Sequence, residues 1–341
     1  MENLNIDKVA KLAHVSRSVV SRVLNDHPNV SSDAKARVME VVEKYNYKPN
    51  SVARSLATNT AHEIGVLVTK SGDEALGSAF WTQIHLGIFE ECTKRGYFVS
   101  LSYVSESQKD DLHNFILNER RLDGYILLTQ EVTDLVGEML FEKDIPIVLV
   151  GHIPKKKKVS SVDVDNYLGG KFATEHLIKA GHKNIGIILA SLDVEESIDR
   201  LKGYKDALKE GGLEFNENYM SVVDYQFKDG YDSMDEWIKN DAEITAVFCA
   251  SDTLAMGALL AVKDNGKKVP DDYAFVGFDN LNFSEYTSPP LTTVQQPIYE
   301  KGQTAAKILI NQIEGTSSEK KQFNLEPTLV IRESCGVKRV M

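Results

Sequence analysis

The sequence has few cysteines and no long apolar run. Cys92, Cys249 and Cys335 lie far apart and form no CxxC pair, so neither a disulfide framework nor a zinc site is expected. No stretch of about 18 apolar residues occurs, and the first residues contain no apolar signal core. We therefore expect a cytoplasmic protein that neither spans a membrane nor is secreted.

The motifs of common enzyme classes are also missing. The chain has no Walker loop, no GxGxxG or GxSxG turn and no HExxH helix. His176 and His182 lack the i, i+4 spacing of metal ligands on a helix. We expect no enzymatic activity, no metal and no cofactor.

Basic charge is scarce and unevenly distributed. The 341 residues carry a net charge of −11. Residues 1–61 contain nine Lys or Arg against six Asp or Glu, whereas the rest contain 30 against 44. A small basic module on an acidic body is typical of a nucleic-acid-binding domain attached to a domain of another function.

The basic module has the pattern of three short helices. Apolar residues recur at helical spacing over residues 6–13, 17–25 and 34–45. Two helices joined by about three residues, with a third packed across them, form a helix-turn-helix unit. A generic three-helix bundle with solvated arginines is the alternative that spacing alone leaves open.

In a helix-turn-helix unit the start of the second helix enters the DNA major groove. The exposed residues expected there are Arg17, Ser18, Ser21 and Arg22. Arginine can read guanine with two hydrogen bonds, and Ser16 with the amides near it could hold a phosphate at the helix N-terminus. We predict base reading by Arg17, Ser18 and Arg22.

The stretch IDKVAKLAHVSRSVVSRVLN, followed by VSSDAKARVMEVVEKYNYKPNSVARSL, resembles the DNA-binding head of the LacI/GalR family of bacterial transcription regulators. The resemblance implies that Asn25, Ser31, Tyr47 and Asn50 also belong to the DNA-binding set. His14 is a departure, since the turn usually has Gly or Asn. Histidine accepts left-handed backbone better than most residues, so we expect the turn to survive.

Residues 50–61 have helix-forming composition but span only about two helical turns, and an isolated helix this short is marginal in water. In the family that the head resembles, this segment is a hinge helix that folds on the operator. The resemblance places Ala53 and Leu56 in the central minor groove, where an apolar wedge kinks DNA. On local sequence alone, Leu56 is an ordinary packing residue.

The remaining residues alternate short apolar runs with amphipathic helices. Such alternation indicates parallel sheets covered on both faces, and the number of runs favours two lobes. The apolar runs cover residues 64–68, 98–104, 125–129, 145–150, 185–190, 246–250 and 274–278.

This body resembles the LacI/GalR effector-binding core, which is related to periplasmic sugar-binding proteins. Matching segments include VDVDNYLGGKFATEHLIKAGHKNIGII and VFCASDTLAMGALLAVKDNGKKVPDDYAFVGFDN. The expected fold class is an all-α helix-turn-helix head joined to an α/β core of two Rossmann-like lobes.

The resemblance also implies three crossings between the lobes, near residues 161, 291 and 322. We therefore expect discontinuous lobes behind the head and hinge. The expected domains are 1–49 for the DNA-binding head, 50–61 for the hinge, 62–161 plus 292–322 for the first lobe, and 162–291 plus 323–341 for the second.

Ligands of open α/β folds bind beyond the carboxyl ends of the strands, where Gly151 and several polar residues follow the apolar runs. The resemblance implies that Arg200 and Asp279 contact ligand hydroxyls and that aromatic residues flank the ligand. Taken singly, Asp279 could cap a turn and Arg200 could form a surface ion pair. The expected effector-binding set is Phe80, Trp81, Gln130, Arg200, Tyr225, Ser251, Asp252 and Asp279.

This set suits a sugar, since charged groups can bind hydroxyls and aromatic faces can bind C–H surfaces. An α-glucoside such as maltose is the candidate. We predict a homodimeric repressor of sugar-utilisation genes that reads a pseudo-palindromic operator and binds a small carbohydrate between its lobes. Two alternatives stay open: control mainly by a protein co-regulator such as a phosphocarrier, and a solute-binding protein.

Overall fold

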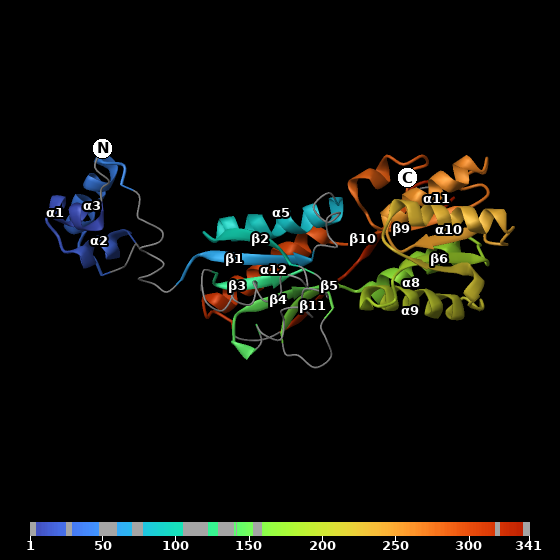
Figure 1. The fold of residues 1–341 in the computed structure, drawn as a ribbon, viewed down its shortest axis with the longest axis horizontal. Helices are drawn as coiled ribbons and strands as arrows, with labels where there is room; N and C mark the ends of the chain where they lie inside the picture. Colours follow the sequence, from blue (N-terminus) through green and yellow to red (C-terminus); the bar gives the residue numbers. More distant parts are fainter. Residues whose placement is uncertain are drawn as a thin grey trace. The chain divides into compact units, whose positions relative to one another are not determined.

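The computed structural model describes two units of the chain, Met1–Glu63 and Ile64–Met341 (Figure 1). The first unit is the expected helical head, and the second is the expected α/β core. The residues described are 5–24, 29–47, 60–69, 78–104, 122–128, 140, 142–152, 159–317 and 321–336.

The head contains the three expected helices around a small apolar core. Val9, Val20 and Val38 are completely buried, one from each helix. His14 lies in the turn between the first two helices with a φ of +53°, the left-handed conformation expected for that position. The helices are α1 (Ile6–Leu12), α2 (Arg17–Leu24) and α3 (Ser32–Lys44).

The first lobe is built on a six-stranded sheet with the order β11-β5-β4-β3-β1-β2. The pairings among β1, β3, β4, β5 and β11 are parallel. Helices α5 (Ala79–Lys94) and α12 (Ile298–Ile313) contribute apolar side chains to its core. The strands are β1 (Glu63–Thr69), β2 (Phe98–Val104), β3 (Gly124–Leu127), β4 (Ile147–Val150), β5 (Ser160–Val164) and β11 (Gln322–Leu325).

The second lobe has a sheet with the order β12-β10-β9-β8-β6-β7. Its neighbouring strands are parallel, except for the antiparallel pair β10 and β12. The strands are β6 (Ile185–Ala190), β7 (Met220–Val223), β8 (Ala246–Cys249), β9 (Ala274–Asp279), β10 (Thr292–Gln295) and β12 (Thr328–Val330). Short 3-10 segments, η3 (Glu217–Tyr219) and η4 (Asn282–Glu285), precede β7 and β10.

Helices cover both faces of the second sheet (Figure 1). Ile187 and Leu189 of β6 belong to the core shared with α8 and α9, whereas Ile188 belongs to the core shared with α10 and α11. Successive side chains of a strand point to opposite faces, so each helix pair packs on its own face. The helices are α8 (Asn166–Lys179), α9 (Glu195–Glu210), α10 (Phe227–Lys239) and α11 (Asp252–Asp264).

Three pairs of helices approach closely through glycines on both partners. A Cβ atom at any of these glycines would lie 1.9–2.4 Å from a carbonyl oxygen of the facing helix. Any larger residue would therefore push the helices apart. The glycines are Gly87 and Gly302 between α5 and α12, Gly170 and Gly203 between α8 and α9, and Gly230 and Gly257 between α10 and α11.

The chain passes between the two sheets three times, a few residues later than the sequence predicts. It leaves the first sheet after Val164, returns between Gln295 and Ile298, and crosses again between Leu325 and Thr328. The expected positions near 161, 291 and 322 are corrected accordingly. The difference arises because β5, β10 and β11 each continue for three or four residues past the expected position.

Candidate DNA-binding and effector sites

The predicted base-reading residues lie on the outer side of α2. Arg17, Ser18 and Arg22 are exposed, and Ser21 is half-buried. Val20, on the opposite side of the helix, is completely buried in the head core. The apolar side thus anchors α2, while its polar side is accessible to DNA.

The start of α2 carries two serine hydroxyls and an arginine. The Oγ of Ser16 accepts a hydrogen bond from the amide of Val19 at 3.4 Å and lies 2.8 Å from the Oγ of Ser18. The Nε of Arg17 lies 3.9 Å from Asp7 Oδ1, a long contact between exposed groups. A helix N-terminus with hydroxyls and an arginine beside it is suited to bind phosphate.

Other predicted DNA contacts have different environments. Ser31 is exposed and caps α3 by accepting a hydrogen bond from the amide of Ala34 at 3.3 Å. Tyr47 is 9% exposed and packs in the head core, so the structure gives it a packing role and its contact with DNA stays a prediction. Asn25, Asn50, Ala53 and Leu56 lie outside the described residues.

Arg200 of α9 is buried beside the carboxyl end of β8. Its Nε donates to Asn166 Oδ1 at 2.9 Å, and its Nη1 donates to the carbonyl of Ala250 at 2.6 Å. The guanidinium carbon lies 3.8 Å from the centre of the Phe278 ring. These contacts fix the guanidinium plane, and no hydrogen bond to a described residue engages Nη2.

Asp279 ends β9 with a φ of +117°, a rare conformation outside glycine that clusters at functional sites. Its Oδ1 accepts a hydrogen bond from Gln296 Nε2 at 2.6 Å, and its carboxylate also accepts one from the amide of Asp252. Burial raises the pKa of Asp279 to about 6, while the charges of Arg200 and Lys301 lower it. The carboxylate retains lone pairs for a ligand hydroxyl.

Ser251 and Asp252 stand where expected, at the start of α11, but their side chains are engaged within the protein. The Oγ of Ser251 accepts a hydrogen bond from the amide of Leu254 at 3.1 Å. The carboxylate of Asp252 accepts from the amide of Leu281 at 2.8 Å and from Thr293 Oγ1 at 2.6 Å. Burial raises the pKa of Asp252 well above its usual range, and the nearby charge of Asp279 adds to this.

The structure gives Ser251 and Asp252 a supporting role, and their contact with a ligand stays a prediction. Asp252 connects the start of α11 to β10 and to the residue that follows the turn after β9. Because its amide also binds Asp279, it helps to hold that carboxylate in place. Position in the sequence alone could not show that these two side chains form hydrogen bonds within the protein.

The predicted aromatic residues are accessible to different degrees. Tyr225 follows β7, is 41% exposed, and lies with its hydroxyl 3.4 Å from the Oγ of Ser197. Phe80 and Trp81 occupy the first turn of α5, with ring centroids 5.1 Å apart in an edge-to-face arrangement. Both are partly buried against the first-lobe core. Gln130 lies outside the described residues.

Sequence reasoning missed four buried polar residues at the crossings. Asn166 begins α8, where it binds Arg200, and Gln296 precedes α12, where it binds Asp279. Lys301, in the first turns of α12, lies with its Nζ 2.6 Å from Oδ1 of Asp163 in β5. The local sequence around Lys301 contains other polar residues, so it gave no signal that this lysine is buried and did not identify its partner.

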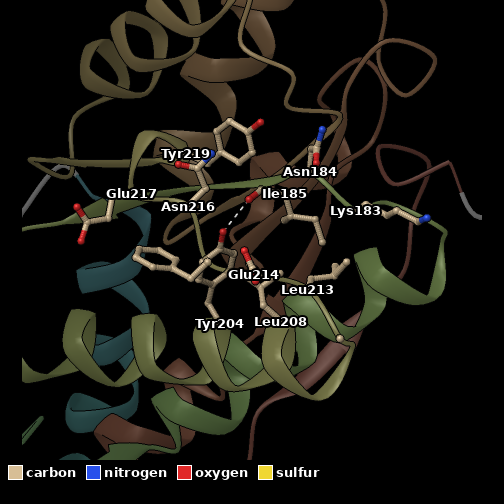
Figure 2. A pocket seen from close by; sticks show the side chains of 12 residues that line it. Lys183, Asn184, Ile185, Tyr204, Leu208, Leu213, Glu214, Asn216, Glu217 and Tyr219 are labelled. Carbon is tan, nitrogen blue, oxygen red and sulfur yellow. Dashed lines mark hydrogen bonds between the residues drawn. The ribbon is translucent and has the colours of Figure 1, made fainter.

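A separate pocket of about 440 Å³ lies at the other end of the second sheet (Figure 2). It is lined in part by Asn184 and Ile185 at the start of β6 and by Tyr219 just before β7. Tyr204 closes one side and donates a hydrogen bond to the carbonyl of Ile185 at 2.6 Å. This pocket is at the amino ends of the strands, so it is distinct from the predicted effector site.

The described part of the chain carries neither a cluster of metal-binding side chains nor a helix suited to cross a membrane. No group of three or more His, Cys, Asp or Glu residues there is placed to hold a metal ion. No helix among these residues is long and apolar enough to cross a membrane.

Both units match known families. The lacI family of bacterial regulatory proteins matches residues 5–50, and the periplasmic binding protein-like domain matches residues 174–335. The HTH-type transcriptional regulator CelR of Thermobifida fusca is 33% identical over 96% of this chain and 97% of its own length. The HTH-type transcriptional repressor PurR of Vibrio atlanticus (strain LGP32) is 34% identical over 96% of this chain and 98% of its own.

Solved structures agree with this assignment. A complex of the transcriptional regulator CelR with cellobiose superimposes with a TM-score of 0.76 and 31% identity, covering 97% of this chain and 99% of that one. A lac repressor dimer bound to operator and the anti-inducer ONPF has a TM-score of 0.82 and 25% identity, covering 98% and 99%.

The head and the two-lobed core define a DNA-binding transcription regulator whose core has the fold of periplasmic binding proteins. The relatives that match nearly end to end are regulators rather than enzymes. This chain belongs to the lacI family of bacterial regulatory proteins.

Proposed function

We propose that this regulator is a repressor of sugar-utilisation genes and that a small carbohydrate bound between its lobes controls it. The observation that carries the proposal is that Arg200 and Asp279 are both buried, with the charge of Arg200 acting on the Asp279 carboxylate. The guanidinium has a donor nitrogen to offer, the carboxylate has acceptor lone pairs, and both are fixed by neighbours. Exposed Tyr225 offers an aromatic face to sugar C–H groups.

In this proposal, two heads of a homodimer read the half-sites of a pseudo-palindromic operator. Arg17, Ser18 and Arg22 contact bases, and the hinge, residues 50–61, lies in the central minor groove. Effector binding moves the two lobes and changes the spacing of the paired hinges. The effector can shift this equilibrium only by its differential affinity for the two states.

The test is an anisotropy measurement of the full-length protein on a labelled pseudo-palindromic duplex with a central CG step. Salt is held constant because phosphate contacts make affinity strongly salt-dependent. The added sugars are maltose, the α-glucoside expected from the sequence, and cellobiose, which is bound to the similar CelR. Ribose is included because it is bound to a similar regulator from Enterococcus faecium, with a TM-score of 0.70 and 28% identity over 80% of this chain and 98% of that one.

We expect one sugar to weaken operator binding by the wild type. Asp279→Ala should bind the operator normally but lose the response to that sugar, because it lacks the acceptor. An unchanged response would remove Asp279 from the effector site. If the wild type binds the duplex specifically and no sugar acts, control by these carbohydrates is refuted and a protein co-regulator becomes the leading explanation.

A further inference from the structure

The strand β4 of the first lobe ends at a glycine whose side-chain space is already filled. Gly151 has a φ of +115°, and its amide donates to the carbonyl of Val162 at 2.9 Å. A Cβ atom on Gly151 would lie only 2.9 Å from Oε1 of Glu196. The carboxylate of Glu196 therefore occupies the space that a side chain at position 151 would take.

Glu196 belongs to the second lobe, so this contact joins the two lobes. It lies in the first turn of α9, four residues before Arg200, and residues four apart share one side of a helix. His152, the residue after Gly151, is also close to α9. Burial raises the pKa of Asp199 in α9, and the charge of His152 lowers it. The end of β4 and the start of α9 thus face each other at the carboxyl edge of the first sheet.

Glu196 is half-buried. Within the part of the chain that the structure describes, no hydrogen bond or ion pair engages its carboxylate. An ionised carboxylate only accepts hydrogen bonds and has about four lone-pair sites. With Arg200 as donor one turn away, this side of α9 presents a donor and an acceptor that match neighbouring hydroxyl groups of a sugar.

We propose that Glu196 is a specificity residue of the effector site. It accepts hydrogen bonds from hydroxyl groups of the effector and rejects ligands that carry an anionic group at that position, because like charges placed together disfavour binding. This inference rests on the proposed carbohydrate control and narrows the ligand to sugars that are neutral where they meet the start of α9.

The test is isothermal titration of the full-length protein with cellobiose, maltose and the 6′-phosphate of each. Glu196→Gln keeps the size of the side chain and removes its charge. We expect it to bind the neutral disaccharide at least about tenfold more weakly, since hydrogen bonds to charged groups contribute strongly. Its preference for the neutral sugar over the phosphate should shrink by a similar factor.

The matched control is Glu195→Gln, which removes the same charge from the same helical turn. The charge of Glu195 acts on Asp199, four residues along, and no atom of Glu195 lies within 4 Å of a Cβ atom placed on Gly151. We expect this control to bind all four sugars within about twofold of the wild type. Comparing the two variants separates the loss of a favourable charge at the helix N-terminus from the loss of a contact with the effector. Thermal unfolding checks that both variants are folded.

The outcomes separate two failures. If the wild type binds a disaccharide and Glu196→Gln binds that sugar and its phosphate with the same two affinities as the wild type, Glu196 does not read the effector, although the carbohydrate proposal stands. Equal losses in both glutamine variants also overturn the inference, because the effect is then one of general charge. If the wild type binds none of the four sugars, the proposed function fails and this inference fails with it.

Discussion

The buried ion pair of Lys301 and Asp163 permits a quantitative test of how the crossings are held. The two charged atoms are 2.6 Å apart, and the side chains are only 7% and 11% exposed. The pair connects β5, which leads into the first crossing, to α12, which follows the second. Lys301→Met keeps most of the apolar stem and leaves the Asp163 carboxylate buried without its cation. Breaking a buried pair in this way costs about 3–5 kcal/mol, which is the expected loss in the free energy of unfolding.

A double variant distinguishes the cost of leaving the Asp163 carboxylate unpaired from the cost of lost side-chain packing. Asp163→Asn combined with Lys301→Met removes both charges but keeps an acceptor for the amide of Val164, which Asp163 binds at 2.8 Å. Since neutral replacements of a whole buried pair are often nearly neutral in stability, the double variant should recover most of the loss. Urea unfolding followed by circular dichroism measures all variants.

The control is Lys171→Met, whose ammonium lies 2.7 Å from Glu210 on the surface. Exposed pairs contribute little, so this variant should unfold almost as the wild type does. The reasoning is refuted if Lys301→Met is as stable as the wild type, or if the double variant is no more stable than the single one.

Three further predictions follow from other contacts. Arg22→Ala should weaken operator binding by about 1–3 kcal/mol and should weaken binding to scrambled duplexes by less. Equal losses on both duplexes, measured by anisotropy, would exclude base reading by Arg22. Effector affinity should decrease as the pH is lowered from about 7.5 to about 5.5. Burial raises the pKa of Asp279 to about 6, and a protonated carboxyl accepts fewer hydrogen bonds. In Asp279→Asn, titration calorimetry should show no such dependence. Gly257→Ala places a Cβ 1.9 Å from the carbonyl of Phe227 and should cost about 1–3 kcal/mol in urea unfolding; unchanged stability would mean that the α10–α11 spacing adapts.

The head could be predicted from sequence because its signals are local. Apolar spacing defined all three helices, and their ends differ from the expected ones by no more than two residues. His14 adopts the left-handed turn expected of it. Tyr47 is the exception: its motif is typical of a DNA-binding head, but only packing shows that its side chain is buried.

In the core, apolar runs predicted β1, β2, β3, β4, β6, β8 and β9, but not the other strands. The missed strands are short, and several are polar or partly exposed; β11, for example, has exposed residues over most of its length. Such strands form because a neighbouring strand from a distant part of the chain offers its backbone. β5 pairs with β11 and β10 with β12, and neither pairing has a local pattern in the sequence.

The proposed effector site combines residues that a motif identifies with residues that only the fold brings together. Arg200 and Asp279 stand in recognisable segments, whereas Lys301 and Asp163 are 138 residues apart. A buried charge requires a partner, so knowing that the first turns of α12 are buried would have predicted a carboxylate beside Lys301. Which carboxylate it is depends on where β5 meets α12. The same holds for Gly151. Its lack of a side chain is explained only by the fold, which places the Glu196 carboxylate in that space.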